Sequence, residues 1–138
     1  MILTIPNPIL RQRVTNSPTC IPATVCRMWF HFTDVDTVGL AAPQLGICEP
    51  IILVYGVPMI KPKIIKKEGA KVIGVEGCKS IPNKLYKVNR WSSVHVEFVD
   101  YYGNLKTAVF NDFHARIVQH EIDHLHGILI DERGTLID

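Results

Sequence analysis

Residues 119–124, with the sequence Gln-His-Glu-Ile-Asp-His, constrain this chain most strongly, because their spacing suits a helix that binds a metal. Side chains four residues apart lie on one face of an α-helix, so His120 and His124 can direct their imidazoles to one point. Two such imidazoles form part of many metal sites that keep an open position. Glu121 lies about 100° around the helix from His120, where it can reach a metal-bound water as a general base. The alternative is a pair of solvated histidines on a helix flank.

The helix that carries this motif is predicted between an N-cap at Asn111 or Asp112 and a left-handed residue at Gly127. Apolar residues are spread around nearly its whole circumference, which is typical of a buried helix. These residues are Phe113, Ile117, Val118, Ile122 and Leu125. Histidines on a buried helix need polar partners, and this need favours the metal site.

The sequence before this helix is rich in predicted strands. Residues 51–55 and 71–75 are β-type runs, whereas residues 57–65 contain two prolines and suit an edge or bulged strand. Residues 91–100 alternate apolar and polar side chains, and residues 105–110 return as their hairpin partner.

Helical structure is also predicted near the N-terminus. Residues 21–35 have helix-type apolar spacing, and residues 1–19 are expected to form an extended arm with a helical turn at 9–12. Together these elements predict an α+β fold, with antiparallel or mixed β-sheets packed around a central buried helix.

Composition limits the domain organisation and the partners. At 138 residues the chain is expected to be one domain over residues 1–138. Its formal charge of +2 is too small to favour nucleic acid or an anionic membrane as a partner. The apolar stretch at residues 50–60 is too short to span a bilayer, and the N-terminus lacks a basic leader. A cytoplasmic location is therefore expected, in a bacterium or, for a virus-encoded protein, in its host.

Four cysteines are present without any C-x-x-C spacing. Disulfides are not expected in a chain without an export signal. Cys20, Cys26 and Cys48 are expected to be small buried apolar residues.

A third metal ligand is expected upstream of the histidines. The extended motif H-E-x-x-H-x-x-G-x-x-H would place its last ligand at Ile130, which cannot bind a metal, and Glu132 is too close along the chain. Cys78 is the best candidate, because it follows a predicted strand within the segment Glu-Gly-Cys-Lys-Ser at residues 76–80. A thiolate with two imidazoles suits iron(II), zinc, cobalt or nickel.

Residues 37–46, Thr-Val-Gly-Leu-Ala-Ala-Pro-Gln-Leu-Gly, predict a tight loop with small side chains. Such residues allow the backbone to approach another group closely. Gln44 is the polar side chain in this loop; it serves either as a structural hydrogen bond or as a donor to a substrate oxygen.

Three segments together resemble the peptide deformylase family. That family is marked by G-x-G-x-A-A-P-Q-x-G, E-G-C-L-S and Q-H-E-x-D-H-L, in this order. The corresponding segments here are T-V-G-L-A-A-P-Q-L-G at residues 37–46, E-G-C-K-S at 76–80 and Q-H-E-I-D-H-L at 119–125. Weaker similarities at residues 3–10, 88–90 and 115–118 extend the resemblance over almost the whole chain.

The resemblance implies hydrolysis of the formyl group from N-formylmethionyl termini of nascent polypeptides, with release of formate. One divalent metal ion would be held by Cys78, His120 and His124, with water in the fourth position. Iron(II) is the expected physiological metal, with zinc(II), nickel(II) and cobalt(II) as alternatives. Glu121 would take a proton from that water and later protonate the leaving amine.

The resemblance also assigns roles in binding the substrate. The side-chain amide of Gln44 and the backbone N–H of Lys79 would stabilise charge on the formyl oxygen. Backbone groups around Gly39 and Gly77 would hold the peptide in an extended conformation. The methionine side chain would enter a pocket that includes Val38, Ile117 and His120. Formyl-Met nascent peptides and the ribosome exit region are the expected partners of a monomer.

Two positions depart from the family's pattern. Thr37 replaces the first glycine of the loop, and Lys79 replaces leucine beside Cys78. Only the backbone N–H of Lys79 is needed, so activity is expected to survive, and its ammonium is expected to favour an acidic residue further along the substrate. The chain ends soon after the predicted metal helix, so a short form without a C-terminal helix is expected.

Two other functions fit the same residues. A metallopeptidase is the second candidate, although the missing downstream ligand weakens it. A non-catalytic, metal-stabilised protein that captures nascent chains or sequesters metal is the third. Glu121 and Gln44 argue against this last candidate, because a purely structural metal site needs neither.

Overall fold

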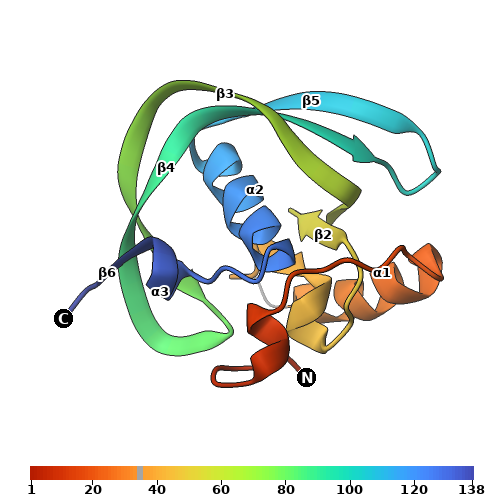
Figure 1. The fold of residues 1–138 in the computed structure, drawn as a ribbon, viewed down its shortest axis with the longest axis horizontal. Coiled ribbons are helices and arrows are strands. Elements are labelled where there is room, and N and C mark those ends of the chain that lie inside the picture. The colour runs from red at the N-terminus through yellow and green to blue at the C-terminus, as the bar shows by residue number, and fades with distance from the viewer. Residues whose placement is uncertain (34–35) are drawn as a thin grey trace.

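The computed structural model describes residues 1–33 and 36–138, and its most prominent feature is a long curved hairpin that arches around a helix (Figure 1). The hairpin consists of β3 and β4, and the helix is α2. The elements in chain order are η1 (Pro8–Arg11), α1 (Ile21–Trp29), η2 (Phe30–Thr33), β1 (Gly39–Ala41), η3 (Ala42–Leu45), β2 (Ile51–Val54), β3 (Val57–Cys78), β4 (Ile81–Val99), β5 (Leu105–Asn111), α2 (Asp112–Leu125), α3 (Ile130–Arg133) and β6 (Gly134–Leu136).

The strands of the described residues form one six-stranded sheet in the order β1-β2-β3-β4-β5, with β6 paired to β4. Every strand pair in this part of the chain is antiparallel. The fold is therefore α+β with an antiparallel sheet. The sequence predicted either antiparallel or mixed sheets, and the described residues form a single antiparallel sheet.

Helix α2 follows β5 directly and has close to the predicted bounds. Asn111 is its N-cap in an extended conformation, although its side chain makes no capping hydrogen bond. The helix ends before Gly127, whose φ is +73°. A Cβ at that glycine would lie 2.4 Å from the carbonyl oxygen of Arg11, so both the backbone conformation and the space require glycine.

Strand β2 is buried on both faces, and this places it between α1 and α2. Ile52 and Val54 pack in the cluster that contains Val118 and Ile122 of α2. Ile51 and Leu53 pack in the cluster that contains Val25 and Met28 of α1. Burial of each such side chain is worth about 1.5–3 kcal/mol, so the core fixes α2 firmly against the sheet.

The N-terminal helix is shorter than predicted. Helix α1 ends at Trp29, and η2 continues to Thr33 with non-helical dihedral angles at Phe32. The indole N–H of Trp29 donates a hydrogen bond to the carbonyl oxygen of Gly56 at 2.8 Å, which anchors the end of the helix. The prediction of a helix over residues 21–35 was therefore too long, and its residues 34 and 35 lie outside the described part.

The long hairpin corrects three strand predictions. Residues 57–65 and 71–75 belong to one strand, β3, and β4 begins at Ile81 rather than at residue 91. The predicted bulge exists, since the register shifts between Ile60 and Lys63 and Lys61 has a positive φ of +50°. The short helix α3 and the strand β6 at the C-terminus were not predicted at all.

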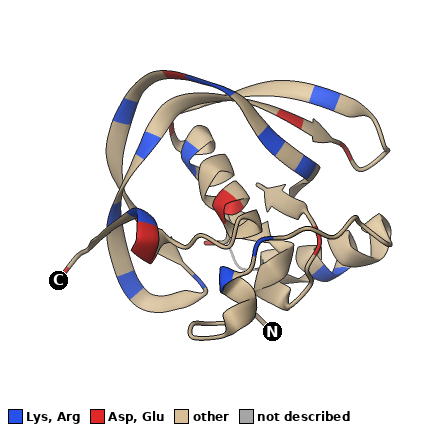
Figure 2. Cartoon of the chain, viewed as in Figure 1, with Lys and Arg blue, Asp and Glu red and all other residues tan. Residues whose placement is uncertain are grey.

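Lysines are concentrated on β3 although the net charge is only +2 (Figure 2). Among the described residues, β3 pairs only with β4 beyond residue 60. The other side of β3 is therefore a sheet edge there. Charged side chains on an edge strand disfavour pairing with another chain. We therefore attribute the lysines to protection of this edge. They are Lys61, Lys63, Lys66, Lys67 and Lys71.

Several predicted burials were wrong. Cys20 and Cys26 are exposed and Cys48 is half-buried, whereas all three were expected in the core. Phe113 of α2 is 55% exposed, so the apolar face of this helix does not extend around its whole circumference. All four cysteines are free in the structure. None of the helices in the described residues is long and apolar enough to span a membrane.

Candidate active site

A cavity of about 840 Å³ separates the end of β3 from α2. All of the predicted site residues except His124 line it. Its walls come from the loop before β1, the end of β3, the β3–β4 turn and one side of α2. The lining residues are Asp36, Thr37, Val38, Gly39, Leu40, Gln44, Val75, Glu76, Gly77, Cys78, Lys79, Ile81, Pro82, Asn83, Lys84, Leu85, Phe113, Arg116, Ile117, His120 and Glu121.

The three predicted metal ligands converge at one end of this cavity. One ligand atom from each of Cys78, His120 and His124 lies within 4.8 Å of the other two. The Sγ of Cys78 is 3.5 Å from Nε2 of His124, and the two imidazole centroids are 5.3 Å apart. Cys78 and His120 are half-buried, whereas His124 is 1% exposed. A thiolate and two imidazoles with one accessible side are a donor set suited to a divalent ion.

Glu76 fixes the orientation of His120. The carboxylate of Glu76 lies 2.8 Å from Nδ1 of His120, which directs the other ring nitrogen away from it. A hydrogen bond to the far nitrogen of a metal-binding histidine sets its tautomer and raises its basicity. This contact therefore prepares Nε2 of His120 to act as a ligand.

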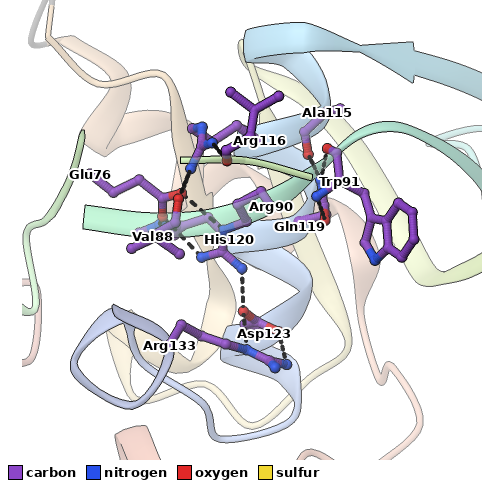
Figure 3. Close-up of polar contacts among 11 residues, drawn as sticks. Glu76, Val88, Arg90, Trp91, Ala115, Arg116, Gln119, His120, Asp123 and Arg133 are labelled. Carbon is purple, nitrogen blue, oxygen red and sulfur yellow. Dashed lines mark hydrogen bonds and ion pairs between the residues drawn. The ribbon is translucent and has the colours of Figure 1, made fainter. Parts of the chain in front are cut away.

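A chain of ion pairs supports Glu76 (Figure 3), and all of its side chains except that of Arg133, which is 47% exposed, are largely buried. Arg90 of β4 donates two hydrogen bonds to Glu76, both at 2.9 Å, and a third to Asp123 at 2.5 Å. Arg133 completes the chain with two hydrogen bonds to Asp123, at 3.1 and 3.0 Å. Burial raises the pKa of Glu76, but the hydrogen bonds from Arg90 and His120 outweigh it and lower the pKa to about 2. Glu76 is therefore an anion at neutral pH.

The charges around the histidines favour a cation between them. Burial lowers the pKa of His120, but the Glu121 carboxylate and the contacts with Cys78 and Glu76 outweigh it and raise the pKa well above its ordinary value. Burial and the charges of His120 and Arg90 hold the pKa of His124 well below its ordinary value, so that ring is neutral and keeps a lone pair. The anionic groups thus favour positive charge at His120, and the neutral ring of His124 offers a lone pair, which together suit a metal ion.

Glu121 is buried beside the ligands, with one oxygen lacking a partner. Its side chain is pressed against the β1 backbone, because a Cβ at Gly39 would lie 2.5 Å from Oε2. Oε1 is buried and has no hydrogen-bond partner among the described residues. Burial raises the pKa of Glu121 to about 7. Such an oxygen is poised to exchange a proton with a molecule in the cavity.

Gln44 is 3% exposed and is held in one orientation. Its Oε1 accepts a hydrogen bond from the backbone N–H of Ala41 at 3.0 Å, so its NH₂ group must point the other way. That NH₂ donates to Ser80 Oγ at 3.1 Å and lies 3.8 Å from Cys78 Sγ. Both interpretations of Gln44 therefore have support: it ties down the loop, and it directs a donor toward the ligands.

The remaining predicted residues lie around the cavity. Lys79 follows the end of β3 with an exposed side chain. Val38 accepts a hydrogen bond from the backbone N–H of Tyr55 at 2.7 Å, and Ile117 is 4% exposed in the core beside it. At Gly77, a Cβ would meet the side chain of Leu85 at 3.2 Å. The structure brings all of these residues to one site.

Sequence reasoning missed the buried ionic residues around the ligands. No role was assigned to Glu76, Arg90, Arg116 or Asp123, although each is largely buried in the structure. A signal was available, because Glu76 and Asp123 are each within three residues of predicted ligands. Carboxylates next to a buried metal site need cationic or hydrogen-bonding partners.

Comparisons with known proteins agree with this geometry. The family model for polypeptide deformylases matches residues 1–136. The peptide deformylase of Syntrophomonas wolfei is 39% identical over 141 residues, which cover 96% of this chain and 91% of that protein. Peptide deformylase 2 of a Nostoc species is 33% identical, with 96% and 84% of the two chains covered.

Solved structures show the same fold. An inhibitor complex of Plasmodium falciparum peptide deformylase superposes with a TM-score of 0.90 at 33% identity, covering 98% of this chain and 89% of that chain. A Met-Ala-Ser-bound peptide deformylase of Acinetobacter baumannii gives a TM-score of 0.89 at 30% identity, with 96% of each chain covered.

The fold and the site thus define a hydrolase with a Cys/His cluster that has the ligand atoms to hold a metal ion. The chain belongs to the polypeptide deformylase family. This family is metal-dependent and removes the formyl group from the amino termini of nascent peptides.

Proposed function

We propose that this chain hydrolyses the formyl group from N-formylmethionyl peptides, with residues 1–138 as one catalytic domain around α2. The observation that carries the proposal is the convergence of Cys78, His120 and His124, with ligand atoms within 4.8 Å, beside the unpartnered carboxylate oxygen of Glu121. These four residues meet at one end of a cavity large enough for a peptide end.

Cys78, His120 and His124 would hold the metal. Iron(II) is the expected ion, with zinc(II), nickel(II) or cobalt(II) as alternatives. When bound, the ion supplies a Lewis acid that activates water and polarises the formyl carbonyl. Glu76 holds the imidazole of His120 in the orientation that this role needs.

Glu121 is the proton carrier in this proposal. Its buried Oε1 accepts the proton that the attacking water loses, and the same carboxyl group then delivers a proton to the nitrogen of the leaving amine. A carboxyl group with its pKa raised to about 7 can both accept and return a proton near neutral pH. Burial keeps bulk water away from this carboxylate and is the main cause of its raised pKa.

The formyl oxygen would be stabilised by two donors. The NH₂ group of Gln44 is oriented toward Cys78, since Ala41 fixes its other end. The backbone N–H of Lys79, next to Cys78 in the chain, is the second donor. Hydrogen-bond donors that are already fixed where negative charge develops stabilise the transition state more than mobile water molecules do.

The peptide would lie along the backbones that border the cavity. Gly39 and Gly77 permit close approach from two sides, because neither carries a side chain. Val38 and Ile117 would form the apolar wall for the methionine side chain. The Acinetobacter relative that binds Met-Ala-Ser supports a peptide of this kind as a ligand for the shared fold. We further propose a monomer that acts on nascent chains at the ribosome exit region, which rests on the family resemblance alone.

A product analysis with formyl-Met-Ala-Ser separates this proposal from its alternatives. A deformylase produces formate and Met-Ala-Ser, whereas a metallopeptidase cleaves a peptide bond within the chain. A non-catalytic binding protein leaves the peptide intact. Peptide bond cleavage, or an intact peptide after incubation with folded, metal-replete protein, would reject the proposal.

A further inference from the structure

One side chain bridges the space between β3 and α2. Arg116 lies one helical turn before His120, and its side chain is 11% exposed. Its Nη1 donates hydrogen bonds to Glu76 Oε2 at 2.6 Å and to the carbonyl oxygen of Val88 at 2.9 Å (Figure 3). Its Nη2 donates to the carbonyl oxygen of Val72 at 2.6 Å. One guanidinium from α2 therefore holds both β3 and β4.

Gly74 provides the room for this guanidinium. A Cβ at Gly74 would lie 2.8 Å from Cζ and 2.9 Å from Nε of Arg116. Gly74 does not have a positive φ, so the backbone conformation of the strand at this position would accept alanine. The glycine is therefore explained by the space that Arg116 occupies and not by backbone strain.

Each of the two residues precedes a candidate ligand by four positions in the sequence. Gly74 precedes Cys78 by four residues on β3, and Arg116 precedes His120 by four residues on α2. The cavity lies between these two elements, so packing of apolar side chains does not fix their separation there. The guanidinium is planar and offers its donors in a rigid fork, which fixes a distance and an angle.

Arg116 adds something that Arg90 does not. Arg90 also binds Glu76, and it connects this carboxylate to Asp123. Arg90 therefore keeps Glu76 charged and oriented even without a second guanidinium. The contacts that only Arg116 makes are those with the backbone carbonyls of Val72 and Val88, and these fix the position of the strands.

We propose that Gly74 and Arg116 are a positioning pair, which sets the separation of β3 from α2 and thereby holds Cys78 opposite His120 and His124. Neither residue touches the reacting atoms. The catalytic consequence of this pair rests on the proposed function, whereas its consequence for metal retention does not.

The test uses Arg116→Lys, Arg116→Ala, Gly74→Ala and the double variant Gly74→Ala/Arg116→Ala, with Arg27→Lys on the exposed face of α1 as a matched control. Four quantities are measured: the rate of metal transfer to a colorimetric chelator, kcat and KM for formyl-Met-Ala-Ser, and the melting temperature. Metal transfer and kinetics are measured well below the melting temperature of each variant.

We expect Arg116→Lys and Gly74→Ala each to lose metal about 10- to 100-fold faster and to lower kcat by a similar factor, because loss of a group that orients a ligand has effects of this size. KM should change little, since the substrate-binding backbones remain. In the Arg116→Ala background, Gly74→Ala should have no further effect, because the guanidinium that it would meet is gone. Arg27→Lys should match the unmodified protein.

A lower melting temperature of Arg116→Lys with unchanged metal transfer and kcat would overturn the proposal, since the pair would then only stabilise the fold. An equal effect of Gly74→Ala with and without the guanidinium would also overturn it. If Gly74→Ala alone does not fold, recovery of folded protein in the double variant supports the pairing, and failure of both variants contradicts it. The expected metal-transfer pattern without formate release by the unmodified protein would reject the proposed function but support the pair.

Discussion

The ammonium of Lys79 donates a hydrogen bond to the hydroxyl of Thr37 at 2.5 Å, across the edge of the cavity. These are two positions at which the chain departs from its family's motifs, where glycine and leucine are the usual residues. Neither glycine nor leucine has a side chain that could form this bond. The two departures are therefore coupled in space, and together they place a polar, charged group on the wall of the cavity in which we propose that the substrate binds.

Charge reversal at Lys79 should change the preference for substrate charge. Lys79→Glu is expected to lower the ratio of kcat/KM for formyl-Met-Asp-Ser to that for formyl-Met-Lys-Ser by about two- to fivefold, the size of an exposed ionic interaction. The backbone N–H remains, so both substrates should still react. Lys106→Glu on β5 is the control, since Lys106 does not line the cavity. An equal change in both variants would show that net charge alone is responsible.

Cys78 and Glu121 should separate metal binding from turnover. Cys78→Ser is expected to lose metal to a chelator at least about tenfold faster, because an alcohol is a poorer ligand than a thiolate. Glu121→Gln is expected to keep the metal and to lower kcat by about 10²- to 10⁴-fold, the usual contribution of a general base. Metal content and formate release are measured on the same samples. Equal metal loss in the two variants would contradict the assigned roles.

Substitution of Gly39 should disturb Glu121 without disturbing the metal. A Cβ at this position would lie 2.5 Å from Glu121 Oε2 and 2.9 Å from Cγ2 of Ile117. We expect Gly39→Ala to lower kcat by about 100-fold, because displacement of a catalytic group by about 1 Å has effects of this size. Metal content should stay at that of the unmodified protein. Full activity of Gly39→Ala would show that Glu121 tolerates displacement and that its fixed position is unimportant.

The ion pair between Arg11 and Asp131 should stabilise the protein only above acidic pH. Two hydrogen bonds, at 2.8 and 2.7 Å, connect η1 to α3. The hydrogen bond from Arg11 holds the pKa of Asp131 below its ordinary value of 3.8. A carboxylate with a lowered pKa contributes stability above its ordinary pKa and loses that contribution as the pH falls through the lowered one.

Arg11→Met should therefore lower the free energy of unfolding by about 1 kcal/mol or less at neutral pH, as expected for an exposed pair. The difference from the unmodified protein should shrink as the pH falls below about 4. Urea titrations at several pH values measure it. A difference that stays constant between pH 7 and pH 3 would show that packing of the side chain, and not its charge, is responsible.

The sequence was sufficient to predict which residues of the short motifs meet at the candidate site. The spacing of His120 and His124 depends on helix geometry, and Cys78 followed from the failure of Ile130 as a ligand. The helix α2 was predicted with good bounds because its cap residues and the left-handed Gly127 are local signals.

The long hairpin could not be predicted from local pattern. Most of residues 65–75 in β3 and all of residues 82–85 in β4 are exposed, so these stretches lack the regular apolar alternation of a half-buried strand. The partners of Glu76 were missed for a related reason. Arg90 and Arg116 are distant from it in sequence, and only the pairing of β3 with β4 over α2 brings them together.

Quantitative formate release tests the central claim most directly. Protein loaded with iron(II) under anaerobic conditions, or with nickel(II), is incubated with formyl-Met-Ala-Ser, and formate is measured together with free amino termini. We predict about one metal per chain and equal amounts of formate and Met-Ala-Ser, with activity lost in Glu121→Gln at unchanged metal content. Folded, metal-replete protein that leaves the peptide formylated would contradict the proposed function.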